Sequence, residues 1–332
     1  MEKKTKAASI VALAIVIFCF IFAIGILTME DDYMLYSEKT IVLKKTIKIL
    51  QISDTQIFDM QQGCQDINQS AWHCDARNTT LFVKRLVVEE RPDLVIFAGD
   101  NVVGYNQSKA WLILQELLRP MQNVSFALIL GNHDLEGGDI SAQVMYNDIA
   151  SRYKEAVLGN GLLQVVDQTN RLLYQLFLFD YPYNGSKTAS GYRRWTKHQI
   201  KWYASKRQSV ASLIFAHLPL DVYKEIDSKT MVGDKFEPIY SALNETRLWN
   251  MMQDDRVIAY SCGHDHVNDF CGTVSGSDTM LCYSGGAGYT TYGKTGWPRR
   301  ARIFELNQTH VTTYKRLDDS AYTKKDIQYI NV

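Results

Sequence analysis

Residues 131–134 (GNHD) directly follow an apolar run, residues 124–130, whose length and composition are typical of a buried strand. An amide, an imidazole and a carboxylate side by side pack poorly in a core, but they suit the presentation of polar groups where a strand ends. Asp54, Asp100 and His217 also follow apolar runs, and residues 263–266 (GHDH) follow the last one. We therefore expect a sheet whose strand ends bring polar side chains together at one edge.

Strand-length apolar runs alternate with helical patterns in the first half of the chain, and further strands crowd the second half. This order is typical of an α/β protein with mixed sheets. We predict a two-layer mixed β-sandwich flanked by helices. The expected strands are residues 46–53, 93–98, 124–130, 162–167, 172–180, 211–216 and 256–261, followed by short strands up to 316. The expected helices are residues 78–91, 108–119, 142–156, 196–208 and 246–253.

The N-terminal segment differs from the rest in composition. Residues 7–29 hold no charged side chain, and they follow Lys3, Lys4 and Lys6. About 20 apolar residues cross a hydrocarbon core, so residues 1–29 predict a cytoplasmic tip and a transmembrane signal anchor of a single-pass type II protein, with the bulk lumenal or extracellular. A cleaved signal peptide, which would give a secreted protein, is the alternative, although its apolar region usually has about 7–15 residues. The expected remainder is a stalk at 30–45, a catalytic domain at 46–317 and a C-terminal tail at 318–332.

Cysteines and glycan acceptor sites agree with a lumenal or extracellular location. Cys64 and Cys74 could close a short loop as a disulfide, which an oxidising compartment allows. Cys271 and Cys282 could close a second, leaving Cys262 as a buried thiol, although spacing alone does not determine the pairing. Asn-X-Ser/Thr acceptor sites predict N-glycans. They lie at Asn68, Asn78, Asn106, Asn123, Asn184, Asn244 and Asn307.

The charge balance bears on possible partners. The chain has 36 Lys and Arg against 36 Asp and Glu, so its formal net charge is +0. Binding to nucleic acid depends largely on attraction to phosphates. We therefore expect no nucleic-acid partner.

Four of the 7 histidines share the strand-end position with two aspartates and an asparagine. A single histidine after a strand is usually a core residue, but so many potential ligands together indicate a metal site. Nitrogen and oxygen ligands without thiolate suit Mn, Fe or Zn. Two metals about 3.5–4 Å apart could clamp an in-line displacement at phosphorus. The residues concerned are Asp54, Asp100, Asn132, His133, His217, His264 and His266.

The order of these blocks resembles a known family. They read Asp54-Thr55-Gln56, Gly99-Asp100, residues 131–134, His217 and residues 263–266. The calcineurin-like metallophosphoesterases have the pattern D-x-H, G-D, G-N-H-D/E, H and G-H-x-H, and the resemblance spans residues 46–317. Residues 263–272 (GHDHVNDFCG) and 292–297 (YGKTGW) are similar to a eukaryotic branch that includes plant proteins labelled inactive purple acid phosphatases.

The resemblance implies an enzyme that hydrolyses phosphoric esters at a binuclear metal centre. A hydroxide that bridges the metals would attack phosphorus, and His133 would protonate the leaving oxygen. Asp134 would orient His133 by a hydrogen bond or would only cap its loop. We expect a phosphatase whose substrate is a phosphorylated small molecule or a phosphoprotein. The implied ligands are Asp54 and His266 for the first metal, Asp100 for both, and Asn132, His217 and His264 for the second.

Two positions depart from the family pattern. Gln56 stands where the family usually has histidine, and its amide oxygen would be a neutral and weaker ligand than imidazole. We expect an altered metal preference, with a catalytically impaired glycoprotein scaffold as the alternative. A phosphodiesterase with the same metal core is a further alternative, because the fold serves both reactions. Val103 replaces the tyrosine of the purple enzymes, so we expect a colourless protein.

Residues 285–297, a loop rich in glycine and aromatic residues, could frame a substrate mouth. Equally, this loop could be a glycine turn whose aromatic side chains pack below it. Asp180 is a weaker candidate for the rim of the site. We expect Arg299 and Arg300 to be solvated or paired at the surface. The loop candidates are Tyr289, Tyr292 and Lys294.

Overall fold

The computed structural model describes residues 35–43, 45–67, 74–103, 107–136, 141–181, 192, 195–242 and 246–332. Within these residues, no helix is both long enough and apolar enough to cross a membrane. The predicted transmembrane segment, residues 7–29, lies outside them. The acceptor sites at Asn68, Asn106, Asn184 and Asn244 also lie outside them.

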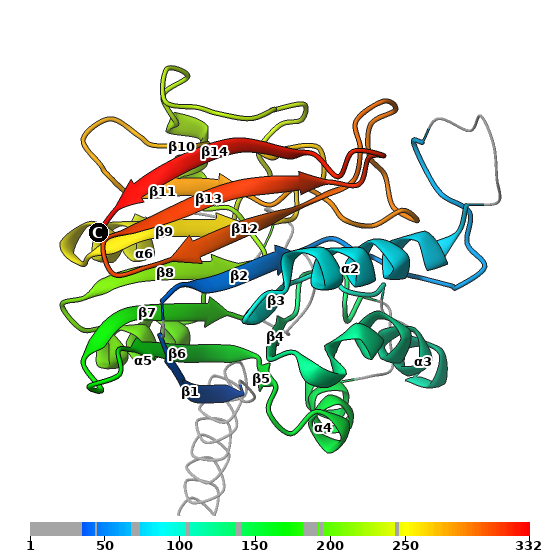
Figure 1. The fold of residues 1–332 in the computed structure, drawn as a ribbon, viewed down its shortest axis with the longest axis horizontal. Coiled ribbons are helices and arrows are strands. Elements are labelled where there is room, and N and C mark those ends of the chain that lie inside the picture. Colours follow the sequence, from blue (N-terminus) through cyan, green and yellow to red (C-terminus); the bar gives the residue numbers. More distant parts are fainter. Residues whose placement is uncertain are drawn as a thin grey trace, which may run out of the picture. The chain divides into compact units, whose positions relative to one another are not determined.

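Two mixed β-sheets, each of seven strands among the described residues, lie at the centre of the fold (Figure 1). In spatial order, sheet A is β1 (Tyr36–Val42), β6 (Asn160–Val166), β7 (Leu172–Phe179), β8 (Ala211–Ala216), β9 (Val257–Cys262), β11 (Met280–Tyr283) and β10 (Cys271–Gly272). Sheet B is β14 (Lys324–Asn331), β13 (His310–Leu317), β12 (Arg300–Leu306), β2 (Ile47–Ile52), β3 (Leu94–Ala98), β4 (Phe126–Ile129) and β5 (Val157–Leu158). The predicted two-layer mixed sandwich is confirmed.

Helices cover the outer face of each sheet. The helices α2 (Ala76–Glu90), α3 (Gln107–Leu118) and α4 (Ala142–Arg152) pack on sheet B, and α5 (Lys197–Lys206) and α6 (Thr246–Asp254) pack on sheet A. Two short 3-10 helices lie at Arg119–Asn123, directly after α3, and at Asp221–Glu225, after β8. Between the sheets, the rings of Phe215 and Phe304 meet edge to face with centroids 5.5 Å apart. Burial of apolar surface on both faces of each sheet therefore holds the layers together.

Local signals in the sequence set the ends of helix α2. Asp75 caps its first turn in a capping box with Asn78, which satisfies backbone N–H groups that have no partner within the helix. The helix ends at Glu90, and its C-cap residue Arg91, whose φ is 48°, directly precedes Pro92. A residue that precedes proline disfavours helical geometry, so the predicted stop before Pro92 is confirmed.

Two segments differ from their predicted roles. Residues 36–42, expected in a stalk, form the edge strand β1, which pairs in parallel with β6. Its exposure alternates, with Glu38 among the residues that face solvent, and a charge there is typical of a sheet edge. Residues 324–331, expected in a tail, form β14, which pairs antiparallel with β13. Sequence reasoning missed both strands because their polar residues are consecutive, at 37–40 and 324–326, and show no alternation of polar and apolar residues.

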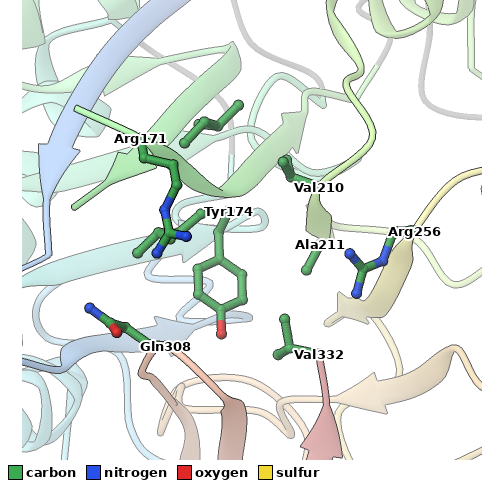
Figure 2. A pocket seen from close by; sticks show the side chains of 9 residues that line it. Arg171, Tyr174, Val210, Ala211, Arg256, Gln308 and Val332 are labelled. Atoms are coloured by element: carbon green, nitrogen blue, oxygen red, sulfur yellow. The ribbon is translucent and has the colours of Figure 1, made fainter. Parts of the chain in front are cut away.

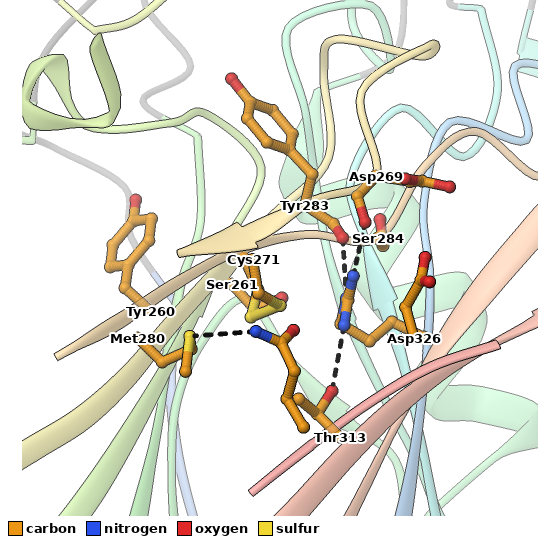
Figure 3. The surroundings of a disulfide bond; sticks show 12 residues. Tyr260, Ser261, Asp269, Cys271, Met280, Tyr283, Ser284, Thr313 and Asp326 are labelled. Carbon is orange, nitrogen blue, oxygen red and sulfur yellow. Dashed lines mark hydrogen bonds between the residues drawn. A yellow bond between two sulfur atoms is a disulfide. The ribbon is translucent and has the colours of Figure 1, made fainter. Parts of the chain in front are cut away.

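Both proposed cysteine pairs are disulfides in the structure. Cys64 pairs with Cys74 across Cα atoms 5.4 Å apart, and Cys271 pairs with Cys282 across 4.1 Å. The second pair joins β10 to β11 inside sheet A (Figure 3). Cys262 is a free, buried thiol, and burial raises its pKa well above the usual value.

The prediction of surface positions for Arg299 and Arg300 is wrong, because both side chains are buried. Asp269 binds the Arg300 guanidinium through Oδ2 and the Lys315 ammonium through Oδ1, the latter at 2.6 Å. Arg302 donates to the Asp269 backbone carbonyl at 2.6 Å. We call Asp269, Arg300, Arg302 and Lys315 the buried charge cluster; Figure 3 shows Asp269 beside the disulfide. Sequence reasoning missed the cluster because only the tertiary fold brings β12 and β13 to residue 269.

Candidate metal centre

The predicted site residues gather at the carboxyl ends of five strands. In sheet B, Asp54 follows β2, Asp100 follows β3 and Asn132 follows β4, and these strands are parallel neighbours. In sheet A, His217 follows β8, and residues 263–266 follow the adjacent parallel strand β9. Parallel strands end at one edge of a sheet, where α/β proteins bind their ligands. The predicted arrangement at one edge is therefore confirmed.

Several of these residues have a left-handed backbone. The φ angles are 56° for Asp54, 36° for Gln56, 52° for Asp100 and 76° for His264. Residues other than glycine disfavour this region, and such strain is concentrated at functional sites. Close packing adds to the constraint, since a Cβ atom on Gly131 would lie 2.2 Å from Asp100 Oδ1. The backbone after these strands therefore adopts unfavourable conformations that place the side chains of the site.

Asp100 is the hub of the site. Its Oδ1 accepts from the backbone N–H of His133 at 2.8 Å, and its Oδ2 accepts from Gln56 Nε2 at 2.7 Å. His217 Nε2 lies 3.2 Å from the same Oδ2. Burial alone would raise the pKa of Asp100, but the His217 imidazole outweighs it and holds this pKa below the usual range. The carboxylate is therefore ionised and oriented by its neighbours.

Three potential ligands already form a compact, buried group. One ligand atom each from Asp100, His217 and His264 lies within 4.8 Å of the others. His217 Nδ1 lies 3.0 Å from the Ala98 carbonyl, so Nδ1–H donates to it and Nε2 faces Asp100, whose carboxylate outweighs the effect of burial and raises the pKa of His217 to about 9. Burial lowers the pKa of His264 well below its usual value, which favours the neutral imidazole that binds metals.

Asp54 and His266 form a second pair at the same edge. His266 Nε2 lies 3.6 Å from Asp54 Oδ1, and His266 Nδ1 lies 3.1 Å from the Tyr292 carbonyl. The carbonyl fixes the tautomer, as at His217, and burial lowers the pKa of His266 to about 3. Burial also raises the pKa of Asp54 to about 8, offset in part by His217. A bound cation would add positive charge beside the two buried carboxylates of Asp54 and Asp100.

The side-chain amide of Asn132 shows whether the residues of the site are suited to hold a metal. Its side chain is buried, and neither Oδ1 nor Nδ2 has a hydrogen-bond partner among the described residues. A buried amide without partners costs about 1–3 kcal/mol. Coordination of Oδ1 to a metal beside His217 and His264 would offset that cost. This set of oxygen and nitrogen donors fits Mn, Fe or Zn.

Asp134 organises the loop and does not orient His133. Its carboxylate accepts from the backbone N–H groups of Gly131, Asn101 and Val102 at 2.7, 2.8 and 2.9 Å. These bonds tie the loop after β4 to the loop after β3. Of the two roles that the sequence left open, the contacts support loop capping.

Glu136, which sequence reasoning missed, contacts the imidazole of His133. Its carboxylate pairs with His133 Nδ1, and the His133 side chain is 34% exposed. A carboxylate at Nδ1 places a proton there and leaves Nε2 toward solvent. The spacing of three residues was the available signal, since residues at i and i+3 meet in a turn.

The glycine-rich loop contributes some of its candidates to the site and not others. The Tyr292 ring stacks on His266 with centroids 3.9 Å apart and an interplanar angle of 9°. By contrast, Tyr289 donates to Asp318 Oδ2 at 2.7 Å and packs against the core beneath α2. Lys294 Nζ lies 4.5 Å above the Phe236 ring. Packing of an aromatic side chain below the loop is therefore confirmed for Tyr289, and a substrate mouth framed by Tyr292 stays a prediction.

Asp180 supports the site from behind. It is buried, accepts from the Leu130 N–H at 2.6 Å, and accepts from the Tyr146 hydroxyl at 2.7 Å. Burial raises its pKa to about 8. Because Leu130 directly precedes the 131–134 loop, this bond anchors the loop, and a rim position for Asp180 was wrong.

A cavity of about 210 Å³ lies elsewhere. Figure 2 shows Arg171, Val210 and Arg256 around it. These residues directly precede β7, β8 and β9, so the cavity opens at the ends of the strands opposite to the metal ligands. It is separate from the candidate metal centre.

The fold and the ligand set agree with the comparison to known families. The model of the calcineurin-like phosphoesterase family matches residues 47–268, more than half of the chain. The chain belongs to this family, and the resemblance predicted from the motifs is confirmed. Family membership makes it a metallophosphoesterase with a possible metal site.

Similarity to individual proteins agrees with the match to the family. Two Arabidopsis thaliana proteins are named probable inactive purple acid phosphatases. Number 29 is 31% identical over 335 residues, covering 85% of this chain and 85% of that protein. Number 14 is 30% identical over 339 residues, covering 85% and 83%. A dimetal phosphatase from Danio rerio superposes with a TM-score of 0.61 at 14% identity, covering 87% of this chain and 99% of that one, which shows a shared fold.

Proposed function

We propose that this chain is a phosphomonoesterase that uses two metal ions at the strand ends. The observation that carries the proposal is the buried group of Asp100, His217 and His264, whose ligand atoms lie within 4.8 Å of one another. Two backbone carbonyls support it, because they accept from Nδ1–H of His217 and His266 and leave Nε2 of each ring directed at a carboxylate of the site, where a metal would take the place of a proton.

Each metal has its own ligands and shares Asp100. Ions held there would supply Lewis acidity and an activated nucleophile for attack at phosphorus. His133 acts beside them: Glu136 holds Nδ1, and Nε2 of the protonated imidazole gives its proton to the leaving oxygen. The ligands are Asp54 and His266 for the first ion, Asn132, His217 and His264 for the second, and Asp100 for both.

The test uses the full chain, produced through a secretory route, with bound metals measured directly. We expect bound Mn, Fe or Zn and faster hydrolysis of nitrophenyl phosphate than of bis(nitrophenyl) phosphate. Asp100→Asn replaces the shared carboxylate and should reduce the rate by at least about 100-fold, since even groups that only support ligands cost 10–100-fold. Absence of metal, or an unchanged rate in the variant, would contradict the proposal.

The same assay separates the competing functions. A preference for the bis-ester would make the chain a phosphodiesterase with the same metal core. Bound metal without hydrolysis of either ester would favour the catalytically impaired scaffold, which Gln56 and the word inactive in the relatives' names both suggest. Substrates of the proposed enzyme are phosphorylated small molecules or phosphoproteins.

We also propose that residues 7–29 anchor the protein as a single-pass type II membrane protein with its catalytic part lumenal or extracellular. The two disulfides support an oxidising compartment, and the acceptor residue Asn123 is exposed. We expect the protein to stay in membranes after alkaline extraction and to lose mass on enzymatic removal of N-glycans. A protein found in the medium would instead support signal cleavage.

A further inference from the structure

Gln56 occupies the position at which the family pattern has histidine, and both ends of its amide are engaged. Nε2 donates to Asp100 Oδ2 at 2.7 Å, and Oε1 accepts from the Thr291 hydroxyl at 2.6 Å. The residue is buried, and its backbone N–H also donates to the Asp100 carbonyl at 2.9 Å. Gln56 is thus fastened to Asp100 through both its main chain and its side chain.

The chemistry of the partners determines which way the amide points. An ionised carboxylate only accepts hydrogen bonds, so the group that faces Asp100 must be the amide NH2. The oxygen then faces Thr291, whose hydroxyl can donate. This orientation follows from Asp100 and does not depend on how oxygen and nitrogen were assigned.

The orientation removes Gln56 from the first set of ligands. Only the amide oxygen could bind a metal, and it is directed at the Thr291 hydroxyl while the NH2 group faces the shared carboxylate. The first site then retains Asp54, His266 and the shared Asp100, while the second has four protein ligands. Three of those four already lie within 4.8 Å of one another.

We propose that Gln56 is a positioning residue that holds the shared Asp100 and does not bind metal, so that the second site fills before the first. The inference rests on the two-metal centre of the proposed function. It differs from the ligand role that the motif implies for this position, because it makes the two affinities unequal.

Titration of the metal-free full chain with Mn²⁺ tests this directly, by calorimetry together with electron paramagnetic resonance. We expect two binding steps that differ by at least about tenfold in affinity. At one equivalent the spectrum should be that of isolated Mn²⁺, and spin coupling between two ions should appear only on further addition. Two steps of equal affinity, with coupled ions from the first addition, would overturn the proposal.

Two variants separate a positioning role from a ligand role. Gln56→His supplies a nitrogen ligand and should tighten the weaker step by about 10-fold or more, leaving the stronger step within about threefold. Gln56→Ala removes the bonds to Asp100 and Thr291 and supplies no ligand; because both metals share Asp100, both steps should weaken by similar factors below about tenfold. If Gln56 were a ligand, the alanine variant would instead lose the weaker step selectively.

Circular dichroism of each metal-free variant verifies its fold before titration. Metal binding is measured here without any substrate. A protein that binds two Mn²⁺ unequally but hydrolyses neither ester would contradict the proposed function and leave this inference standing. Equal binding in an active enzyme would do the reverse.

Discussion

Replacing His133 with asparagine is expected to lower kcat for phosphate monoesters by roughly 10²–10⁴-fold, the range typical of general acid–base groups. The backbone N–H of residue 133, which donates to Asp100 at 2.8 Å, survives the change. Metal content should therefore be unaffected while the proton donor is lost. Steady-state kinetics with a nitrophenyl ester and an alkyl ester, alongside metal analysis, measure both effects.

The leaving group tells a proton donor from a simple charge stabiliser. Nitrophenolate leaves without help, whereas an alkoxide needs a proton, so the alkyl ester should lose more activity in His133→Asn. Equal losses for both esters would argue against proton donation, and loss of metal would make His133 a ligand. Glu136→Gln is the companion variant: it should weaken only the orientation of the imidazole and cost about 10-fold.

The second large effect is expected in the buried charge cluster. Asp269→Asn should lower the free energy of unfolding by about 3–5 kcal/mol, because removing one partner of a buried ion pair leaves the other uncompensated. Arg300 would lose its carboxylate partner, whereas Lys315 would lose one of two, because its ammonium also pairs with Asp326. Burial raises the pKa of Asp269, but Lys315 and Arg300 more than offset it, so the pKa lies below the usual value. Urea unfolding followed by circular dichroism measures the change.

A matched control lies a few residues away on the surface. Asp278 is exposed, and Asp278→Asn should change the free energy of unfolding by no more than about 0.5 kcal/mol. A similar small change in Asp269→Asn would show that the cluster contributes no more than a surface charge.

Much of the site could be predicted because its residues follow strands in the sequence. Asp54, Asp100 and Asn132 each come after an apolar run, and a buried strand is easily identified from such a run. Since parallel strands end at one edge, the sequence also implied that these side chains meet. This conclusion did not require knowledge of how the two sheets are arranged in the sandwich.

What sequence reasoning missed depends on contacts between distant segments. Thr291 reaches Gln56 only because the loop after β11 folds over the end of β2. Asp269, Arg300 and Lys315 each resemble ordinary surface charges in the sequence, and only tertiary packing buries them together. The edge strand β1 was missed because its polar residues, 37–40, are consecutive and give no alternating pattern.

The backbone N–H of His264 donates to Asp54 across a separation of 210 residues. Closing a loop of that length costs entropy before any contact offsets it, so we expect this part of the site to assemble late in folding. A metal that binds only the completed arrangement stabilises the native chain by about 2.7 kcal/mol at a free concentration 100 times its Kd. The metal supply of the compartment in which the protein matures would thereby set how much of it survives as folded enzyme.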